Sequence, residues 1–344
     1  MPKVLDLIKN EEVIKFSQEL GSICNKNLMG DRLFPDQKTK NLKATYYKLS
    51  DGQQIPTMAT VHAFDTEAKI GVRPSLEKIS VEKLLVKEKI NLSEKEQEYL
   101  DNGISEADDI VEAIFNDFGR LALSVKTRVE VAKMELLSSG KITVKENGLN
   151  YTIDFGLPIE KQTANWSSAD ADIIGDIQKM VDAAKAKGQI VNKCVTTTPV
   201  LMCIAKNKAI QTLIFSTNGV GTFTDLSRIN TLFATMFGFT IELNDDLYRY
   251  DSGKGVLRTA YYIPRNKFIL YTSMSNGTAG HGLWGVTPEE RQQGIWTEKS
   301  SRQFITLTGW SEKDPVVEWF KATGLAVPIM PNRDGHVVAD ITTA

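Results

Sequence analysis

The sequence predicts an α+β protein that is organised around one long helix. Three observations support this fold class. Apolar residues recur at steps of three or four over residues 105–139, which predicts a single amphipathic helix. Asn147-Gly148 stands between two segments of alternating apolar residues, which predicts a hairpin directly after that helix. From residue 166 onward, helical patterns interleave with strands that are not joined as hairpins.

The composition is that of an ordinary globular protein. With 344 residues, of which 42% are hydrophobic and 24% charged, the chain is long enough for about two domains. Its formal net charge of −2 argues against a dedicated nucleic-acid binder. The widely spaced Cys24, Cys194 and Cys203 favour a reducing compartment over a disulfide framework. The sequence shows no secretory signal and no run of ~18 apolar residues, so we expect cytoplasmic synthesis and no membrane partner.

The first 75 residues predict two segments that extend from the body of the protein. Residues 1–35 form an N-terminal arm with a short amphipathic helix. Residues 40–75 form an extended loop, with an Asp51-Gly52 hairpin turn between the β-prone residues 44–49 and 54–56. A loop of this length inside one compact domain would be unusual, so we expect it to contact a partner.

Residues 76–101 are rich in charges of alternating sign, which is typical of a solvated connector. Ser93 and Glu96 resemble a capping box that opens a short helix within this connector. The connector leads into the long helix.

The helix over 105–139 is the strongest local prediction. Ser105 can cap its start, and Gly140 stands where a terminating glycine belongs. Acidic residues dominate its first half and basic residues lead in the second, an order that suits the helix dipole. At about 1.5 Å per residue the helix would be ~50 Å long, which is the length of a structural spine. The hairpin follows over 141–155.

Shorter elements fill the rest of the chain. Helices are predicted from Ser167 or Ser168 to Gly188, from Thr198-Pro199 onward, over 225–237, and from Asp314-Pro315 to Gly324. Strands are predicted over 190–196, 240–243, 257–262, 268–272, 304–308, 325–330 and 337–341.

Two motifs resemble ligand sites. Gly280–Gly285 matches the G-x-G-x-x-G pattern, but no strand runs directly into it and no acidic residue follows at the required distance. We therefore interpret it as a glycine-rich loop. Asp170-Ala171-Asp172 resembles a metal-binding pair, but acidic residues at the start of a helix favour capping and the helix dipole instead.

The remaining reactive residues form no catalytic pattern. The three histidines lack the spacing of a zinc site, and Cys194 and Cys203 fit buried apolar positions better than nucleophiles. The S-x-x-K pattern occurs in three unrelated contexts, as chance would give. We predict no catalytic, cofactor-binding or metal-binding residues, and hence no enzyme and no cofactor.

Several short segments, in this order, resemble the phage lambda-type major capsid protein family, whose fold is the Hong Kong 97-like capsid fold. The segments that carry the resemblance are Asp31–Pro35, Arg128–Lys141, Tyr151–Gly156, Asn165–Ser167, Asp314-Pro315, Ala326–Pro328 and Val337–Asp340. Together they span roughly residues 30–341.

The resemblance implies a subunit in two parts. An N-terminal arm over 1–35 and an extended β-hairpin loop over 40–75 would precede a peripheral domain over 76–165, which would hold the spine helix and its hairpin. An axial domain over 166–312 would follow, and residues 313–344 would return to the peripheral domain.

The resemblance also implies a function. The chain would be the major capsid protein of a tailed bacteriophage, which assembles through a procapsid into pentamers and hexamers of an icosahedral head. Its partners would be copies of itself, a portal protein, a separate scaffolding protein and a decoration protein. Double-stranded DNA would lie against the inner face without sequence-specific contacts. The protein would reside in the virion capsid, and in the host cytoplasm during assembly.

Three alternatives remain open at this point. An encapsulin-like nanocompartment shell shares the fold and would hold cargo without DNA. A nucleotide-binding enzyme would use the Gly280–Gly285 loop and would retain a nucleotide after purification. A phage tail protein would assemble into tubes rather than closed shells.

Overall fold

The computed structural model describes most of the chain in two compact units. The described residues are 28–49, 55, 58–62, 64–68, 70, 76–92, 107–156, 160–215, 224–252, 255–291, 304–314, 316–331 and 334–343. Unit 1 comprises Met1–Ala44, Val81–Lys133 and His281–Ile329, and unit 2 comprises Thr45–Ser80, Met134–Gly280 and Met330–Ala344. The predicted N-terminal helix, the Asp51-Gly52 turn and the Ser93–Glu96 capping box lie outside the described residues.

Unit 1 contains a five-stranded sheet built around one long strand. Its strands are β1 (Asp36–Lys38), β4 (Leu84–Leu92), β13 (His281–Trp284), β14 (Ile305–Lys313) and β15 (Val316–Ile329). β15 pairs antiparallel with β4, β13 and β14, and β1 pairs parallel with β13. Two short helical turns, α3 (Met29–Leu33) and η2 (Glu289–Arg291), complete the unit.

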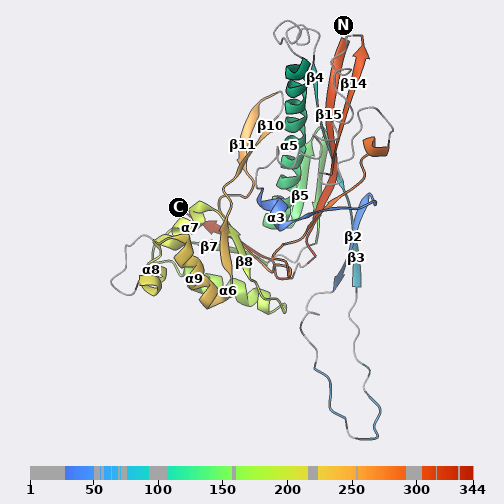
Figure 1. Ribbon diagram of the computed structural model, residues 1–344. Coiled ribbons are helices and arrows are strands. Elements are labelled where there is room, and N and C mark those ends of the chain that lie inside the picture. Colours follow the sequence, from blue (N-terminus) through green and yellow to red (C-terminus); the bar gives the residue numbers. More distant parts are fainter. Residues whose placement is uncertain are drawn as a thin grey trace. The chain divides into compact units, whose positions relative to one another are not determined.

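The long helix α5 (Ala107–Ser139) packs along this sheet (Figure 1). Phe118 of the helix meets Phe320 of β15 edge to face, with ring centroids 5.2 Å apart. The helix and the sheet approach closely at Gly324, where an added Cβ would lie only 2.7 Å from the Val125 methyl Cγ1. The sequence prediction of this helix is confirmed, and so is its apolar stripe from Phe118 through Leu121 and Val125 to Val129.

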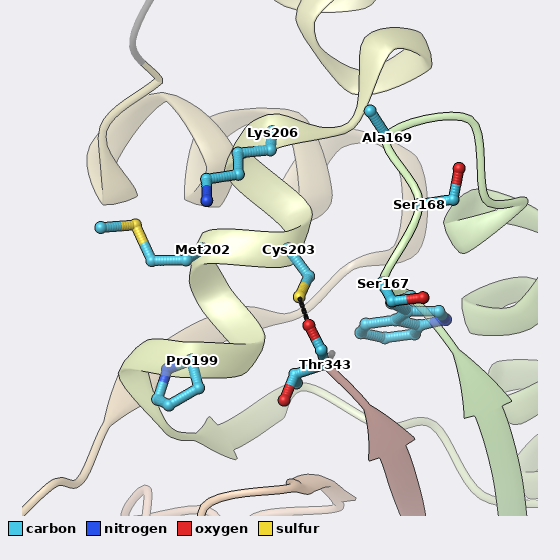
Figure 2. Close-up of a pocket in the computed structure, with 9 residues that line it drawn as sticks. Ser167, Ser168, Ala169, Pro199, Met202, Cys203, Lys206 and Thr343 are labelled. Carbon is cyan, nitrogen blue, oxygen red and sulfur yellow. Dashed lines mark hydrogen bonds between the residues drawn. The ribbon is translucent and has the colours of Figure 1, made fainter.

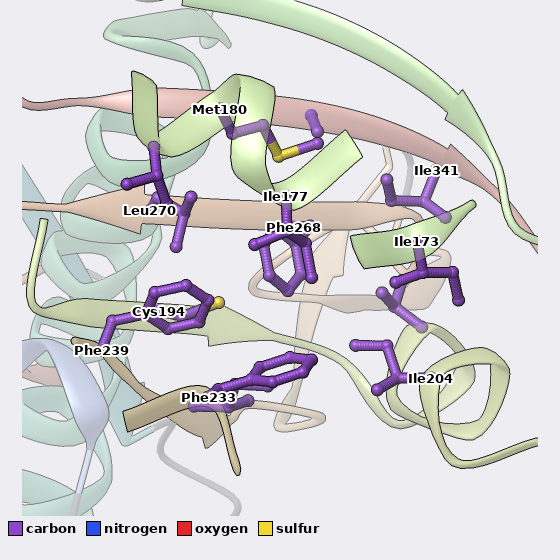
Figure 3. Close-up of a cluster of buried hydrophobic side chains, with 14 of the residues drawn as sticks. Ile173, Ile177, Met180, Cys194, Ile204, Phe233, Phe239, Phe268, Leu270 and Ile341 are labelled. Atoms are coloured by element: carbon purple, nitrogen blue, oxygen red, sulfur yellow. The ribbon is translucent and has the colours of Figure 1, made fainter. Parts of the chain in front are cut away.

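Unit 2 contains a second sheet with helices packed on one face. The strand order is β7 (Glu160–Asn165), β16 (Val337–Thr342), β12 (Lys267–Tyr271), β8 (Lys193–Thr196) and β9 (Thr240–Leu243). The helices are α6 (Ile173–Lys185), α7 (Thr198–Lys206), α8 (Lys208–Phe215) and α9 (Leu226–Phe237). Alternate strand residues such as Phe268, Leu270 and Ile341 meet Ile177 and Phe233 of the helices in one buried cluster (Figure 3). Helices on one face of a mixed sheet give an α+β fold, as predicted.

Three two-stranded ribbons accompany the sheets. They are β5 (Lys141–Glu146) with β6 (Leu149–Asp154), β10 (Leu247–Asp251) with β11 (Leu257–Tyr261), and β2 (Lys43–Leu49) with β3 (Leu76–Glu82). The predicted hairpin after the long helix is confirmed. Asn147 and Gly148 both have positive φ values, 49° and 79°, as the tight turn requires.

One predicted helix is wrong. Residues after Asp314 form the long strand β15 instead of a helix ending at Gly324. Val316, Val317 and Phe320 fit a helical step, but the segment lies between β14 and β4 and pairs with both. Long-range pairing therefore overrides the local pattern.

Other predictions need smaller corrections. Residues 76–92 form β3 and β4 rather than a solvated connector, and the remainder of the predicted connector lies outside the described residues. Lys78, Glu82, Lys87, Glu88 and Lys89 are exposed on these strands, whereas Lys83 is buried. The described partner of β2 is β3, and the predicted pairing of 44–49 with 54–56 falls largely outside the described residues. The helix expected to begin at Ser167 or Ser168 begins at Ile173 as α6, and the strand expected over 190–196 is limited to β8.

Candidate assembly surfaces

The segment between β2 and β3 exposes large apolar side chains almost completely. Met58 is 88% exposed, Val61 and Phe64 are both 99% exposed, and Ile70 is 92% exposed. Burying a side chain of this size stabilises a protein by about 1.5–3 kcal/mol. Four such side chains in water can therefore contribute a substantial free energy to association with another molecule. Exposed apolar side chains that gather on one segment mark an interaction site.

The last residues of the predicted arm are fastened to α5 by a buried glutamate. Glu130 is 1% exposed, and its Oε1 accepts a hydrogen bond from the Gly30 backbone N–H at 2.6 Å. Gly30 allows this approach because an added Cβ would collide with the Glu130 carboxylate. Leu33 and Phe34 next to it are buried. The resemblance motif Asp31–Pro35 therefore begins at an anchor point of unit 1.

A buried lysine fastens the same segment at a second point. The Lys133 side chain is 1% exposed, and its Nζ donates to Asp31 Oδ1 at 2.7 Å and to Asp36 Oδ1 at 2.9 Å. Burial alone would lower the pKa of Lys133, but Asp36 and Asp31 outweigh it and raise the pKa. Lys133 is therefore a charged group that links α3 and β1 to the spine helix.

The Glu130 carboxyl group titrates near neutral pH. Burial raises its pKa to about 7, although the Gly30 N–H and the charge of Lys133 both act in the opposite direction. Its second oxygen, Oε2, is buried and has no hydrogen-bond partner among the described residues. The ionised form is thus only partly satisfied at this position.

Replacing Glu130 by glutamine is expected to remove a pH dependence of stability. Because the folded pKa of about 7 lies above the ordinary 4.5, the native state holds the proton more tightly. The free energy of unfolding of the wild type should therefore fall as the pH rises from 4.5 through 7. Between pH 5 and pH 8 this fall should exceed that of Glu130→Gln by on the order of 1–2 kcal/mol. The glutamine oxygen can still accept from Gly30. Urea unfolding at the two pH values measures the effect, and parallel changes in both proteins would contradict it.

A second charged group lies beside the sheet of unit 1. Glu289 Oε1 accepts from Lys87 Nζ at 2.9 Å and from Lys321 Nζ at 2.8 Å. Burial would raise the pKa of Glu289, but the bonds from Lys321 and Lys87 lower it to about 2. Lys38 pairs with the neighbouring Glu290. These contacts hold η2 against β4 and β15.

Unit 2 has a pocket of about 330 Å³ beside α7 (Figure 2). Pro199, Met202, Cys203 and Lys206 line it from the helix, and the segment 166–169 and Thr343 line it from the other sides. The Cys203 thiol donates to the Thr343 carbonyl at 3.7 Å. Burial raises the pKa of this thiol despite the nearby Lys206, so the sulfur is a protonated, weak nucleophile.

The Gly280–Gly285 motif is part of the sheet of unit 1. Residues 281–284 form β13, which pairs with β1 on one side and β15 on the other. The Gly282 N–H donates to the Pro35 carbonyl, and an added Cβ at Gly282 would meet Asp36 and Phe34. The prediction of a glycine-rich loop is therefore wrong. A nucleotide-binding loop needs backbone N–H groups that are free to contact phosphates, and here β13 is paired on both sides within the sheet.

The other singled-out residues have separate local roles. Asp172 caps α6 by accepting from the Gly175 N–H at 3.0 Å, whereas Asp170 pairs with Lys208. Cys194 is fully buried in the core of unit 2, as predicted, and Cys203 is partly buried. Among the described residues, no group of three or more His, Cys, Asp or Glu side chains could hold a metal ion. No helix in the described part of the chain is long and apolar enough to cross a membrane.

Sequence reasoning missed three groups that the structure makes prominent. Glu130 and Lys133 lie three residues apart on α5 and resemble an ordinary polar face of a helix. His336 is fully buried, and its Nε2 donates to the Leu137 carbonyl at 2.6 Å. Glu130 stands between two apolar residues of the helix, Val129 and Val131. This position was the one sign in the sequence that its charge could be buried.

Comparisons with known proteins identify the fold. No family model and no curated protein matches the sequence. A prophage capsid protein from Escherichia coli CFT073 aligns over 97% of this chain and 99% of its own, with a TM-score of 0.60 and 14% identity. A phage-related protein from Bordetella bronchiseptica RB50 covers 96% of both chains, with a TM-score of 0.54 and 9% identity. The capsid of Myoviridae phage XM1 covers 91% of this chain and 90% of its own, with a TM-score of 0.51 and 12% identity. Over nearly its whole length this chain therefore has the Hong Kong 97-like fold of phage capsid proteins.

Proposed function

We propose that this chain is the major capsid protein of a tailed bacteriophage. In this role it is a structural subunit and not an enzyme. It forms pentamers and hexamers of an icosahedral head around double-stranded DNA. The observation that carries the proposal is a full-length fold match to phage capsid proteins. The exposed apolar segment over residues 58–70 supports it independently, because such a segment requires a partner chain.

The proposed division of labour follows the elements. Unit 1, with α5 and the sheet of β1, β4, β13, β14 and β15, acts as the peripheral domain, and unit 2 acts as the axial domain that meets its copies around five-fold and six-fold axes. This division departs from the one that the resemblance implies, with residues 166–312 axial and 313–344 peripheral, because β13 and β14 pair with β15 whereas β16 pairs with β7 and β12. The arm and the extended loop reach neighbouring subunits. A portal protein, a separate scaffolding protein, a decoration protein and packaged DNA are the further proposed partners. The subunit assembles in the host cytoplasm and ends in the virion capsid.

Assembly of the purified full-length chain tests this function directly. Negative-stain electron microscopy at high protein concentration, with and without a co-expressed candidate scaffold, should show closed shells or rings of five and six subunits. A monomer or dimer under every condition would overturn the proposal. Tubes would favour a tail protein instead.

A variant of the exposed segment sharpens this test. Replacing Met58, Val61, Phe64 and Ile70 together by serine should leave the melting temperature of the subunit unchanged within about 2 °C, because these side chains are almost wholly exposed in the subunit. The same variant should form no stable shells. A matched variant with Phe64→Leu and Ile70→Val keeps the segment apolar and should still assemble. Normal shells from the serine variant would contradict the assigned role of the segment.

A further inference from the structure

The ribbon of β5 and β6 has one covered edge and one free edge. On β5, the Thr143 N–H donates to Glu135 Oε2 at 3.0 Å and the Lys141 N–H donates to Ser139 Oγ at 3.3 Å. The end of α5 therefore occupies the outer edge of β5. β6 pairs with β5 alone among the described strands. We call the other side of β6, over residues Leu149–Asp154, the β6 edge.

The bonds on β5 also show which main-chain groups of β6 are free. In an antiparallel ribbon, two residues that stand opposite each other turn their N–H and C=O groups either towards each other or away from each other. Thr143 stands opposite Thr152 and turns its N–H away, to Glu135. Thr152 therefore turns its own groups outward, and so do Asn150 and Asp154, two positions to either side. No backbone group of the described residues bonds to these outward groups.

The β6 edge lacks the usual protection of a free strand edge. Proteins commonly guard such an edge with a lysine, a proline or a bulge, and β6 contains none of these. Its apolar side chains are open to solvent as well, because Leu149 is 55% exposed and Tyr151 is 43% exposed. Free main-chain groups beside exposed apolar side chains favour the addition of a further strand.

The sequence of β6 is complementary to a second copy of itself. When two β6 edges run antiparallel with Thr152 at the centre, Thr152 faces Thr152 of the second copy, and Asn150 faces Asp154. Each facing pair can exchange both of its main-chain hydrogen bonds, because all three residues have outward groups. The side chains are compatible too. The Asn150 amide can donate to the Asp154 carboxylate, and Tyr151 of one copy stands opposite Ile153 of the other.

Other registers of the two strands are less favourable. A shift of the centre to either side leaves at least one of the three outward residues opposite a position outside β6. A shift that centres the contact on Asp154 also places two carboxylates opposite each other, which is destabilising. The register centred on Thr152 is therefore the one that uses the whole edge.

We propose that two copies of this chain pair through their β6 edges around a two-fold axis, so that their β5–β6 ribbons join into one continuous sheet. The same surface serves both copies, whereas rings of five and six subunits close through contacts between unlike surfaces. The pairing therefore joins subunits of different rings and is separate from the axial contacts within a ring. The proposal rests on the proposed function and names one contact surface within it.

A single cysteine at the centre of the contact tests the pairing. The two facing Thr152 residues would have Cα atoms about 5.5 Å apart, a distance that a disulfide spans. Mild oxidation of the assembled Thr152→Cys protein should give covalent dimers on a non-reducing gel and no larger species, because each contact uses one cysteine from each copy.

Two controls accompany this experiment. Lys145→Cys places the cysteine at an exposed position of the same ribbon, but on β5, and should give no dimer. The wild type, oxidised in parallel, gives the background from its three native cysteines. The absence of a dimer from Thr152→Cys, an equal dimer from Lys145→Cys, or a ladder of species beyond the dimer would overturn the proposal.

Opposite charges at the same position give a second readout. Thr152→Lys and Thr152→Glu should each lower the yield of closed shells about tenfold, because two like charges then face each other across the two-fold axis. Mixing the two variant proteins before assembly should recover most of the yield, because unlike charges then meet. A contact between unlike surfaces would show no such recovery.

Thr143→Lys is the matched control for the charge variants. It places the same charge on the same face of the ribbon but on β5, and should change the yield by less than about twofold. Circular dichroism establishes that each variant subunit is folded. Folded variants whose mixture assembles no better than either variant alone would contradict the pairing.

The pairing and the proposed function can fail separately. If the wild type forms shells but Thr152→Cys gives no dimer and the charge variants assemble normally, the capsid function stands and the pairing is wrong. If the wild type forms no shells, the function itself is wrong. Oxidation of the concentrated Thr152→Cys subunit then still decides the pairing, because dimers support it and their absence overturns it.

Discussion

Replacing Lys133 by methionine is expected to lower the free energy of unfolding by about 3–5 kcal/mol. The lysine Nζ contacts Asp31 and Asp36 from within the core, and its side chain is 1% exposed. Methionine has a similar volume, so the change removes the charge and leaves little cavity. Asp36, whose side chain is 17% exposed, then keeps a negative charge without its partner. Asp31 is 37% exposed and can be hydrated, so the lower end of the range is expected.

Urea unfolding of Lys133→Met beside Lys141→Met measures this effect. Lys141 also pairs with an aspartate, Asp154, at 2.7 Å, but the side chains of that pair are 48% and 53% exposed. Exposed pairs contribute less than about 1 kcal/mol, so the control should be almost as stable as the wild type. Equal losses in the two variants would show that burial does not distinguish the pairs.

His336 is expected to make the folded chain sensitive to acid. Its Nε2 donates to the Leu137 carbonyl, one of the last carbonyls of α5, which have no partner within the helix. Its Nδ1 is buried and has no partner among the described residues, so a proton there would be an unsatisfied buried charge. Burial lowers the pKa of His336 to about 4 from the ordinary 6.5, although the bond to Leu137 acts in the opposite direction.

The direction of the pH effect follows from these two pKa values. The unfolded chain binds the proton more tightly, so the stability from neutral His336 is complete above pH 6.5. It is lost as the pH falls from 6.5 towards 4, by about 3 kcal/mol in all. When the pH falls from 8 to 5, the free energy of unfolding of the wild type should decrease by about 2 kcal/mol more than that of His336→Gln. Glutamine can still donate to Leu137 but does not titrate. A constant difference across this range would contradict the prediction.

The elements that local signals determine were predictable from the sequence. α5 was predicted by its apolar step of three or four residues, and the β5–β6 hairpin by the turn preference of Asn147-Gly148. α7 was predicted from Pro199 in its first turn, and the helix predicted over 225–237 is α9. In each case the residues that form the element also supply the signal.

The elements that depend on distant partners were not predictable in the same way. β15 has a helix-like apolar spacing and is a strand because β4 and β14 pair with it. The charged residues of β4 resemble a connector until their position in the sheet is known. The same limit applies to the anchor of the N-terminal segment. Glu130 and Gly30 are 100 positions apart, and Lys133 and Asp31 are 102 apart, so no local pattern relates them.

The central place of β15 also determines when unit 1 can fold during synthesis. β15 pairs with β4, whose residues leave the ribosome more than 200 positions earlier. Until residues 316–329 emerge, α5 has no complete sheet to pack against, and the apolar sides of both α5 and β4 stay unpaired. Such late, long-range pairing slows folding and exposes the nascent chain to aggregation. Unit 1 therefore gains its complete sheet only after residues 316–329 have been synthesised.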